Sequence, residues 1–170
     1  MSKEKMTSVK NSEVKKTILL TGATGFLGSH LLSALLEEGH KVIVLKRSTS
    51  NLLRINHLMD DIVAYDIDKH ALDDIFAHEC IEAVIHVATS YSREQLNELD
   101  IVDTNILLGI NLLKSASKHG VRIFINTDTF FNNGNLLARH MQAYTLSKKQ
   151  FIEWLKYFSF LGITKINLLF

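Results

Sequence analysis

Proline is absent from this chain of 170 residues, and cysteine occurs once, at position 80. A single cysteine excludes an internal disulfide, which is typical of a reducing compartment and predicts a cytoplasmic location. We expect the side chain of Cys80 to be a small buried hydrophobe, because unpaired cysteine is among the most buried residue types. The absence of proline indicates no function.

Long apolar runs and an excess of charge of one sign are lacking as well. No apolar run is long enough to span a bilayer, and residues 1–16 are too polar for a secretory signal. Acidic and basic residues are interspersed along the chain, and the formal net charge is +1. Because no basic face stands out, we expect no nucleic-acid partner, and because no apolar run spans a bilayer, we expect no membrane partner.

What the chain has is a repeated pattern of helix, glycine and apolar strand. Apolar residues make up 46% of the sequence, which suits one globular domain. We interpret residues 1–15 as a polar tail and residues 16–170 as the folded domain. The pattern predicts an α/β fold, a doubly wound parallel sheet with helices on both faces and about six strands. The strands are expected at residues 17–21, 41–45, 62–65, 83–88, 121–125 and 163–168.

Three glycines follow the first of these strands and precede a helical pattern that ends at Gly39. Gly22 permits a tight turn out of the strand, and Gly25 lets the backbone approach a diphosphate, because it has no Cβ. Gly28 lets the helix pack closely against the sheet. The unpaired N–H groups at the start of that helix favour an anion, so the stretch predicts a dinucleotide site. A glycine-rich turn without any ligand is the alternative.

The spacing T-G-x-x-G-x-x-G resembles that of the short-chain dehydrogenase/reductase superfamily. The resemblance implies a Rossmann-type fold and a nicotinamide cofactor held against this turn. It implies that the following residues bind the cofactor: Gly22, Thr24, Gly25, Phe26, Leu27 and Gly28.

The residues after the second strand bear on the choice of cofactor. An acidic residue there would bind the ribose 2′-hydroxyl of NAD, but this chain has Lys46, Arg47 and Ser48. Two cations and a hydroxyl suit the 2′-phosphate of NADP, which arginine can bind through two hydrogen bonds. We therefore predict NADP (as NADPH) rather than NAD. A solvated basic turn is the alternative.

Further positions resemble the extended short-chain reductases. Asp66 and Ile67 end the third strand, where such families place an aspartate against the adenine amino group. Val87 and Ala88 lie in the stretch that runs beside the cofactor, and Asn105 matches a helix asparagine of the family. The alternatives are that Asp66 only forms a turn at the strand end and that Asn105 is a polar residue on a half-exposed helix face. We assign His86 no proton transfer.

The chemistry is expected to involve Tyr144 and Lys148, which are four residues apart and share one face of a predicted helix. The lysine ammonium would lower the pKa of the tyrosine, which could then exchange a proton with the substrate. Tyr65 and Lys69 have the same spacing but straddle a strand end, so we reject them. The apolar side of the Tyr144 helix is expected to carry Phe151, Trp154 and Leu155.

A hydroxyl just past the fifth strand completes the expected catalytic set. Thr127 would hydrogen-bond the substrate oxygen that becomes charged, and Thr129 is the alternative if the register differs by two. A strand-end threonine that only caps the backbone is also open. Thr129 follows Asp128 where sugar dehydratases have the glutamate used in elimination, which argues against a dehydratase.

The stretch from residue 126 to 151 resembles the CDP-abequose synthases and their relatives. This resemblance, which covers roughly residues 16–170, implies a nucleotide-sugar substrate, with a CDP-sugar favoured. It implies NADPH-dependent reduction of the 4-keto group of a CDP-linked dideoxyhexose for O-antigen, and hence lipopolysaccharide, synthesis. The alternatives are another nucleotide-sugar epimerase or dehydratase, and a non-catalytic NADP-binding module.

The chain ends at Phe170, where extended reductases continue into a substrate-binding part. We therefore expect a domain whose sugar pocket lacks its second wall and which can be inactive by itself. It is either a fragment or truncated reading frame, or a chain that works with a partner chain. A homodimer formed through helices is a further expectation. We expect no metal site.

Overall fold

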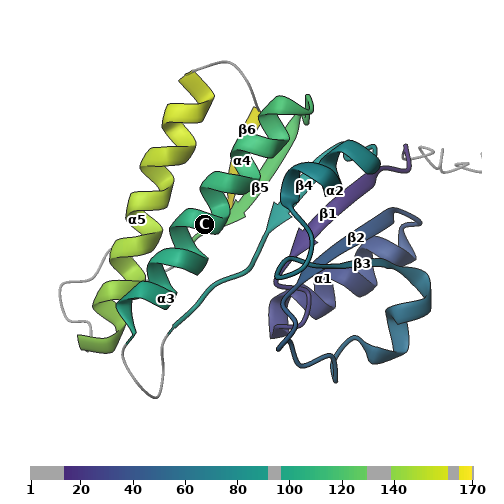
Figure 1. Ribbon diagram of the computed structural model, residues 1–170, viewed down its shortest axis with the longest axis horizontal. Helices are drawn as coiled ribbons and strands as arrows, with labels where there is room; N and C mark the ends of the chain where they lie inside the picture. The colour runs from purple at the N-terminus through teal and green to yellow at the C-terminus, as the bar shows by residue number, and fades with distance from the viewer. Residues whose placement is uncertain (1–13, 92–96, 130–138, 161–164, 170) are drawn as a thin grey trace, which may run out of the picture.

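The computed structural model describes residues 14–91, 97–129, 139–160 and 165–169. Most of the predicted polar tail lies outside these residues. All strands of the sheet are parallel, and their order is β3-β2-β1-β4-β5-β6 (Figure 1). The strands are β1 (Thr17–Thr21), β2 (Lys41–Lys46), β3 (Val63–Asp66), β4 (Ala83–His86), β5 (Ile123–Thr127) and β6 (Lys165–Leu169). The predicted α/β fold with six strands is confirmed.

The connections between strands carry the helices. They are α1 (Phe26–Glu37), α2 (Leu72–His78), α3 (Glu98–Val102), α4 (Leu108–Lys118) and α5 (Arg139–Phe160), with a 3-10 turn η1 (Asn56–Asp61) and a π-helical segment η2 (Asp103–Leu107). Segments α3, η2 and α4 follow one another without a break, and α5 packs beside them (Figure 1). Gly39 ends α1 with a φ of 78°, and Gly120 follows α4 with a φ of 70°. A left-handed residue at this position stops a helix, so the predicted pattern of helix, glycine and strand is confirmed at these two helices.

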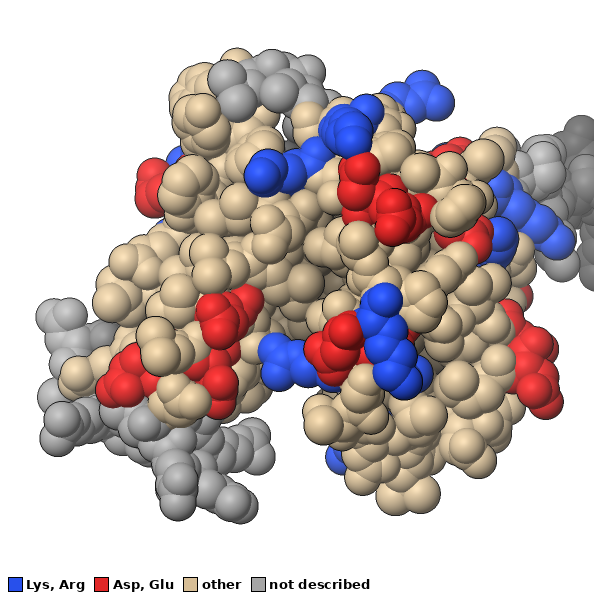
Figure 2. Space-filling model, viewed as in Figure 1, with Lys and Arg blue, Asp and Glu red and all other residues tan. Residues whose placement is uncertain are grey.

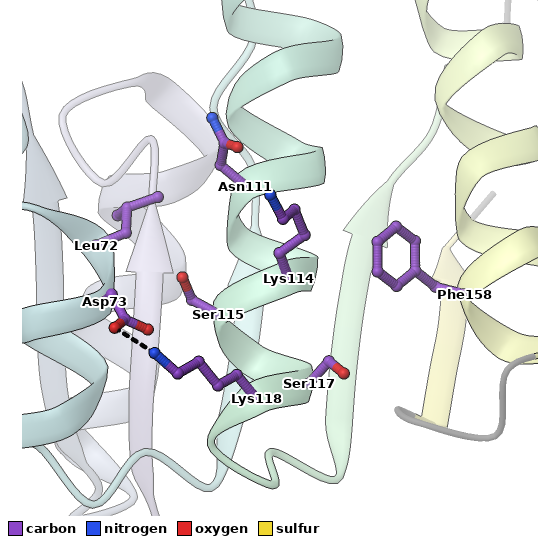
Figure 3. Close-up of a pocket in the computed structure, with 8 residues that line it drawn as sticks. All are labelled: Leu72, Asp73, Asn111, Lys114, Ser115, Ser117, Lys118 and Phe158. Carbon is purple, nitrogen blue, oxygen red and sulfur yellow. Dashed lines mark hydrogen bonds and ion pairs between the residues drawn. The ribbon is translucent and has the colours of Figure 1, made fainter.

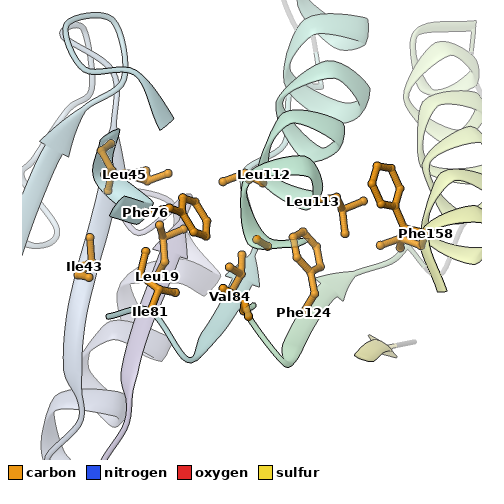
Figure 4. Close-up of a cluster of buried hydrophobic side chains, with 14 of the residues drawn as sticks. Leu19, Ile43, Leu45, Phe76, Ile81, Val84, Leu112, Leu113, Phe124 and Phe158 are labelled. Carbon is orange, nitrogen blue, oxygen red and sulfur yellow. The ribbon is translucent and has the colours of Figure 1, made fainter. Parts of the chain in front are cut away.

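Alternate residues of the central strands supply two apolar layers. Leu19 and Phe124 point to the face that is covered by α2, α4 and α5, where they pack with Leu112 (Figure 4). Ile18 and Leu20 point to the other face, which α1 and η1 cover. Burial on both faces explains why these strands read as continuous apolar runs.

Two strands differ by two residues from the predicted bounds. Strand β4 ends at His86, because the N–H groups of Val87 and Ala88 donate to the hydroxyl of Thr21 instead of continuing the ladder, at 3.2 and 3.1 Å. Strand β5 begins at Ile123, because the N–H of Val121 still closes the end of α4 by donating to the carbonyl of Ala116.

Two predictions of burial are wrong: Cys80 is not buried, and Trp154 is not on the apolar side of α5. Cys80 is exposed in the short connection from α2 to β4, where the neighbouring Ile81 takes the buried place. Trp154 is 42% exposed, because the buried stripe of α5 follows Phe151, Leu155 and Phe158. Those three positions, four and three residues apart, define the face of α5 that meets α4 and the sheet.

The strand order places a crevice at the carboxyl ends of β1 and β4. From β1 the chain winds outward through β2 to β3, and it then crosses to β4 on the other side of β1. The two connecting segments therefore leave the sheet in opposite directions at this point. In open α/β sheets such a switch point is where ligands bind.

Candidate functional site

The glycine turn between β1 and α1 is closely packed at two of its three glycines. Gly22 has a φ of +73°, and a Cβ added there would lie 2.6 Å from the backbone nitrogen of Ala88. A Cβ on Gly28 would lie 2.1 Å from the carbonyl oxygen of Gly22. The tight turn predicted at Gly22 is therefore present, whereas Gly28 brings the helix close to the turn and not to the sheet face. Gly25 is exposed, and its Cβ would meet only that same carbonyl oxygen, at 3.3 Å.

The first turn of α1 presents backbone donors to solvent. Gly25 is its N-cap, and within the described residues this end has neither a capping side chain nor an acidic residue. The free N–H groups and the positive end of the helix dipole are thus uncompensated. Such an end favours an anion.

A groove of about 700 Å³ runs from this helix end along the carboxyl ends of the strands. Most of the predicted site residues line it: Gly22, Thr24, Gly25, Phe26, Leu27, Gly28, Lys46, Arg47, Ile67, Val87, Ala88, Thr127, Tyr144 and Lys148. Asp66 and Asn105 do not. Side chains that are up to about 120 residues apart in the chain therefore share one cavity.

Asp66 does not line the groove, and other residues of the chain bind its carboxylate. Its carboxylate accepts the hydroxyl of Ser48 at 2.6 Å and the N–H of Asp68 at 3.1 Å, and it lies 3.7 Å from the ammonium of Lys46. The hydrogen bond from Ser48 is the main cause that lowers the pKa of Asp66. Lys46 and Ser48, two of the three residues predicted to bind the 2′-phosphate, thus interact with this carboxylate.

Asn105 is 2% exposed, so a half-exposed helix face is the wrong interpretation for it. Its carbonyl oxygen accepts the N–H of Ser90 at 2.7 Å, and its amide donates to the carbonyl of Ser90 and to the hydroxyl of Ser147. Asn105 lies in the π-helical segment η2, which is a kind of helix distortion found often at functional sites. It joins the chain after β4 to α5, and so positions one wall of the groove.

His86 and Thr21 form a buried pair at the ends of β4 and β1. The Thr21 hydroxyl oxygen accepts the N–H groups of Val87 and Ala88, and it lies 2.8 Å from Nδ1 of His86. With its lone pairs used, the hydroxyl donates to Nδ1, which places the ring proton on Nε2. Burial, with a further contribution from Lys148, lowers the pKa of His86 to about 3. The ring is therefore neutral at ordinary pH.

Tyr144 and Lys148 both lie on the groove side of α5, but their electrostatics differ from the expectation. Burial raises the pKa of Tyr144 to about 12, although a hydrogen bond with Thr129 opposes this. The expected lowering by the lysine is wrong for this arrangement. Lys148 donates to the carbonyl of Thr127 at 2.9 Å, and burial lowers its pKa to about 8. The phenol is therefore protonated, and the ammonium is close to its titration range.

The two candidate threonines have different partners. The hydroxyl of Thr127, which lines the groove, donates to the carbonyl of His86 at 3.4 Å. Thr129, the alternative, is the one that hydrogen-bonds with Tyr144. Tyr91, which sequence reasoning missed, lies with its ring centroid 4.5 Å from that of Tyr144. No sequence pattern marks Tyr91, because the contact joins residues far apart in the chain.

The rejected pair is separated in the structure. Tyr65 donates to Glu79 at 2.9 Å, whereas Lys69 pairs with Asp66. The hydrogen bond from Tyr65 is the main cause that raises its pKa. The rejection on strand geometry is confirmed.

Residues 18–160 match the NAD dependent epimerase/dehydratase family. The chain belongs to this family. It is 36% identical to the CDP-abequose synthase of Salmonella muenchen over 83% of this chain and 47% of that enzyme. The chain thus spans about half the length of that relative.

Two solved structures have the same fold as this chain. A UDP-glucose 4-epimerase from Thermotoga maritima, solved with UDP-glucose, superposes with a TM-score of 0.77 at 25% identity, over 89% of this chain and 54% of that one. The Bordetella bronchiseptica enzyme WbmG, in complex with NAD, superposes with a TM-score of 0.74 at 22% identity, over 94% and 54%. The second likeness shows the fold alone.

A second cavity lies beside α4, away from the glycine turn. Its volume is about 590 Å³, and Leu72, Asp73, Asn111, Lys114, Ser115, Ser117, Lys118 and Phe158 line it (Figure 3). Lys118 and Asp73 pair across it at 2.6 Å. None of its lining residues belongs to a strand end, so it is not the site of the predicted chemistry.

Within the described ranges, no three histidine, cysteine or acidic side chains are placed to hold a metal ion. No helix in that part of the chain is long and apolar enough to cross a bilayer. Acidic and basic side chains are mixed over the face that Figure 2 shows.

Proposed function

We propose that this chain is the cofactor-binding part of an NADPH-dependent nucleotide-sugar reductase. In this proposal the enzyme reduces the 4-keto group of a CDP-linked dideoxyhexose, a reaction that supplies an O-antigen sugar. The observation that carries the proposal is the groove in which the glycine turn, Tyr144 and Lys148 meet. The identity with a CDP-abequose synthase supports the substrate class.

The residues at the glycine turn fit a nicotinamide dinucleotide. Gly25 leaves the approach to α1 open, and the uncapped helix end offers N–H donors to a diphosphate. The adenosine would lie toward Arg47 and Ile67, and the nicotinamide toward Tyr144 and Lys148. When bound, the reduced cofactor supplies the hydride for the carbonyl carbon.

The state of Tyr144 suits a proton donor. Its pKa of about 12 keeps the phenol protonated, and an alkoxide is a stronger base than its phenolate. Tyr144 would thus give its proton to the oxygen of the reduced carbonyl. Thr129 holds the phenol by a hydrogen bond, and Thr127, which lines the groove, would donate to the same substrate oxygen. Lys148 is proposed to hold the nicotinamide ribose.

The test is a turnover assay of the protein with NADPH and a CDP-4-keto-3,6-dideoxyhexose. We expect NADPH oxidation and, by NMR, a product with a hydroxyl at C4. Tyr144→Phe should abolish turnover but leave NADPH binding nearly unchanged. Turnover that survives this substitution would show that another group donates the proton.

Two other functions give different results in the same assay. An epimerase would convert a nucleotide sugar without net consumption of NADPH, and a dehydratase would release water. A non-catalytic NADP-binding module would bind NADPH without any turnover. This chain has Thr129 where sugar dehydratases have the glutamate used in elimination, which argues against the dehydratase.

We also propose a homodimer formed through helices α3, α4 and α5. These helices pack against one another, and α3, α5 and the segment η2 leave large apolar side chains in solvent. The exposed set is Leu99, Val102, Leu107, Leu146, Trp154, Tyr157 and Phe160. Exposed apolar side chains gathered on neighbouring helices are typical of an interface.

A further inference from the structure

The connection that follows β4 places a second tyrosine on the groove, against the proposed proton donor. Tyr91 lines the cavity together with Tyr144, and their ring centroids lie 4.5 Å apart with an angle of 31° between the ring planes. Tyr91 is 36% exposed, whereas Tyr144 is 4% exposed. The more exposed ring therefore lies over the buried one, and a contact of this kind between aromatic rings restricts how the Tyr144 side chain can turn.

A hydrogen bond also joins the two phenols. It is among the causes that raise the pKa of Tyr144, whereas the hydrogen bond with Thr129 lowers that pKa. A hydrogen bond that stabilises the neutral form of an acid raises its pKa, and one that stabilises the ion lowers it. Thr129 thus donates to the oxygen of Tyr144, and Tyr144 donates its own proton to the oxygen of Tyr91. The proton that the proposed reaction needs is directed at Tyr91.

One buried amide anchors the backbone on both sides of this contact. The side chain of Asn105 binds the N–H and the carbonyl of Ser90, the residue before Tyr91, at 2.7 and 3.0 Å. The same side chain donates to the hydroxyl of Ser147 at 2.9 Å, and that hydroxyl donates to the carbonyl of Tyr144 at 2.7 Å. The two tyrosines come from distant parts of the chain, but the fold ties both of them to one side chain.

Two titratable groups act on the Tyr144 phenol from segments that are packed against α5. They are Tyr91 and Asp128, and both raise the pKa of the phenol. Asp128 follows β5 and lines the groove, and it acts through its charge. Lys148, on the same helix as Tyr144, donates to the carbonyl of Thr127 instead. A charge favours the protonated phenol without directing its proton, whereas the hydrogen bond to Tyr91 does both.

We propose that Tyr91 is a positioning residue: its ring fixes the Tyr144 side chain, and its oxygen holds the Tyr144 proton within the groove until a substrate carbonyl takes over as the acceptor. This inference rests on the proposed function, in which Tyr144 is the proton donor. The proton passes from Tyr144 to the oxygen of the reduced carbonyl, and no bond of Tyr91 forms or breaks. Tyr91 therefore contributes to kcat and not to cofactor affinity.

The first test does not depend on turnover. NMR with an isotope label at the phenolic carbon gives one signal for each of the four tyrosines, and Tyr→Phe variants assign them. Tyr91→Phe should shift the Tyr144 signal at neutral pH, and in an alkaline titration it should lower the pKa of Tyr144 below about 12. Because phenylalanine keeps the ring, this change reports the lost hydroxyl alone.

Tyr157→Phe is the matched control for the NMR measurement. Tyr157 is an exposed tyrosine of the same helix as Tyr144, and it is not among the residues that line the groove. Its replacement should leave the Tyr144 signal where it is. A Tyr144 signal that stays unchanged in Tyr91→Phe, or that moves equally in both variants, would overturn the inference.

The second test is the turnover assay with two variants of Tyr91. Tyr91→Phe should lower kcat by about three- to tenfold, as expected for one lost hydrogen bond, and leave the KM for NADPH unchanged. Tyr91→Leu, which also removes the ring, should lower kcat further. A raised KM for NADPH with an unchanged kcat would mean that Tyr91 binds the cofactor, and it would overturn the inference. Absence of turnover in the wild-type protein would count against the proposed function, while the NMR result still decides whether Tyr91 holds the proton.

Discussion

At the scale of one residue, the burial of Lys148 serves the proposed site but lowers the stability of the fold. Its ammonium is buried beside the Thr127 carbonyl, and burial lowers its pKa from 10.5 to about 8. The unfolded chain therefore holds this proton more tightly than the folded chain does. The cost to folding is fully present below pH 8 and disappears as the pH rises to about 10.5.

Replacement of Lys148 by methionine should therefore stabilise the fold while it impairs the proposed site. We expect a gain of about 1–2 kcal/mol at pH 7, because the full shift sets an upper limit of about 3 kcal/mol. Urea unfolding at several pH values is the measurement. The difference from wild type should shrink between pH 8 and pH 10.5; a difference that is independent of pH would contradict the buried charge.

Asn126 is a second buried residue that lowers the stability of the fold. It is 1% exposed, and neither polar atom of its side chain has a hydrogen-bond partner in the described part of the chain. Asn126→Leu should stabilise the protein by about 1 kcal/mol, because it removes an unsatisfied buried amide. Asn105→Leu is the control and should destabilise, since Ser90 and Ser147 would lose their partner. Destabilisation by Asn126→Leu in urea unfolding would mean that a bound water satisfies the amide.

At the scale of one element, different glycines of the turn from β1 into α1 are expected to serve stability and cofactor binding. A Cβ on Gly28 would overlap the backbone of Gly22, whereas a Cβ on Gly25 would meet only one atom at 3.3 Å. Gly28→Ala should therefore lower both stability and cofactor affinity. Gly25→Ala should keep the melting temperature nearly unchanged and still weaken NADPH binding, because the methyl group would stand where the diphosphate approaches.

Thermal unfolding combined with an NADPH titration distinguishes the two substitutions. Gly120→Ala is a control outside the groove, since a Cβ there meets nothing within 4 Å and the positive φ adds only strain. We expect it to cost about 1 kcal/mol and to leave NADPH binding unchanged. Loss of stability in Gly25→Ala equal to that in Gly28→Ala would mean that all three glycines serve the turn alone.

At the scale of the whole molecule, the helix face of α3 to α5 is expected to decide the oligomeric state. Leu107 is 47% exposed at the end of η2, and Trp154 is 42% exposed on α5 beside it. Leu107→Glu and Trp154→Glu should each shift the proposed dimer to monomer, because a carboxylate would be buried without a partner. Light scattering after size exclusion measures this. Leu53→Glu is the control, since Leu53 is 82% exposed in the connection from β2 to β3; an equal response would exclude this face.

The sequence by itself determined the sheet, the glycine turn and the spacing of Tyr144 and Lys148. These features depend on local patterns, because glycine positions, apolar runs and helical spacing act within a few residues. The tertiary structure alone decided that Asn105 is buried, that Thr129 bonds Tyr144 while Thr127 donates to the carbonyl of His86, and that Arg47 reaches Thr104. It also reversed the expected pKa shift of Tyr144, because burial depends on segments that meet only when the whole chain is packed.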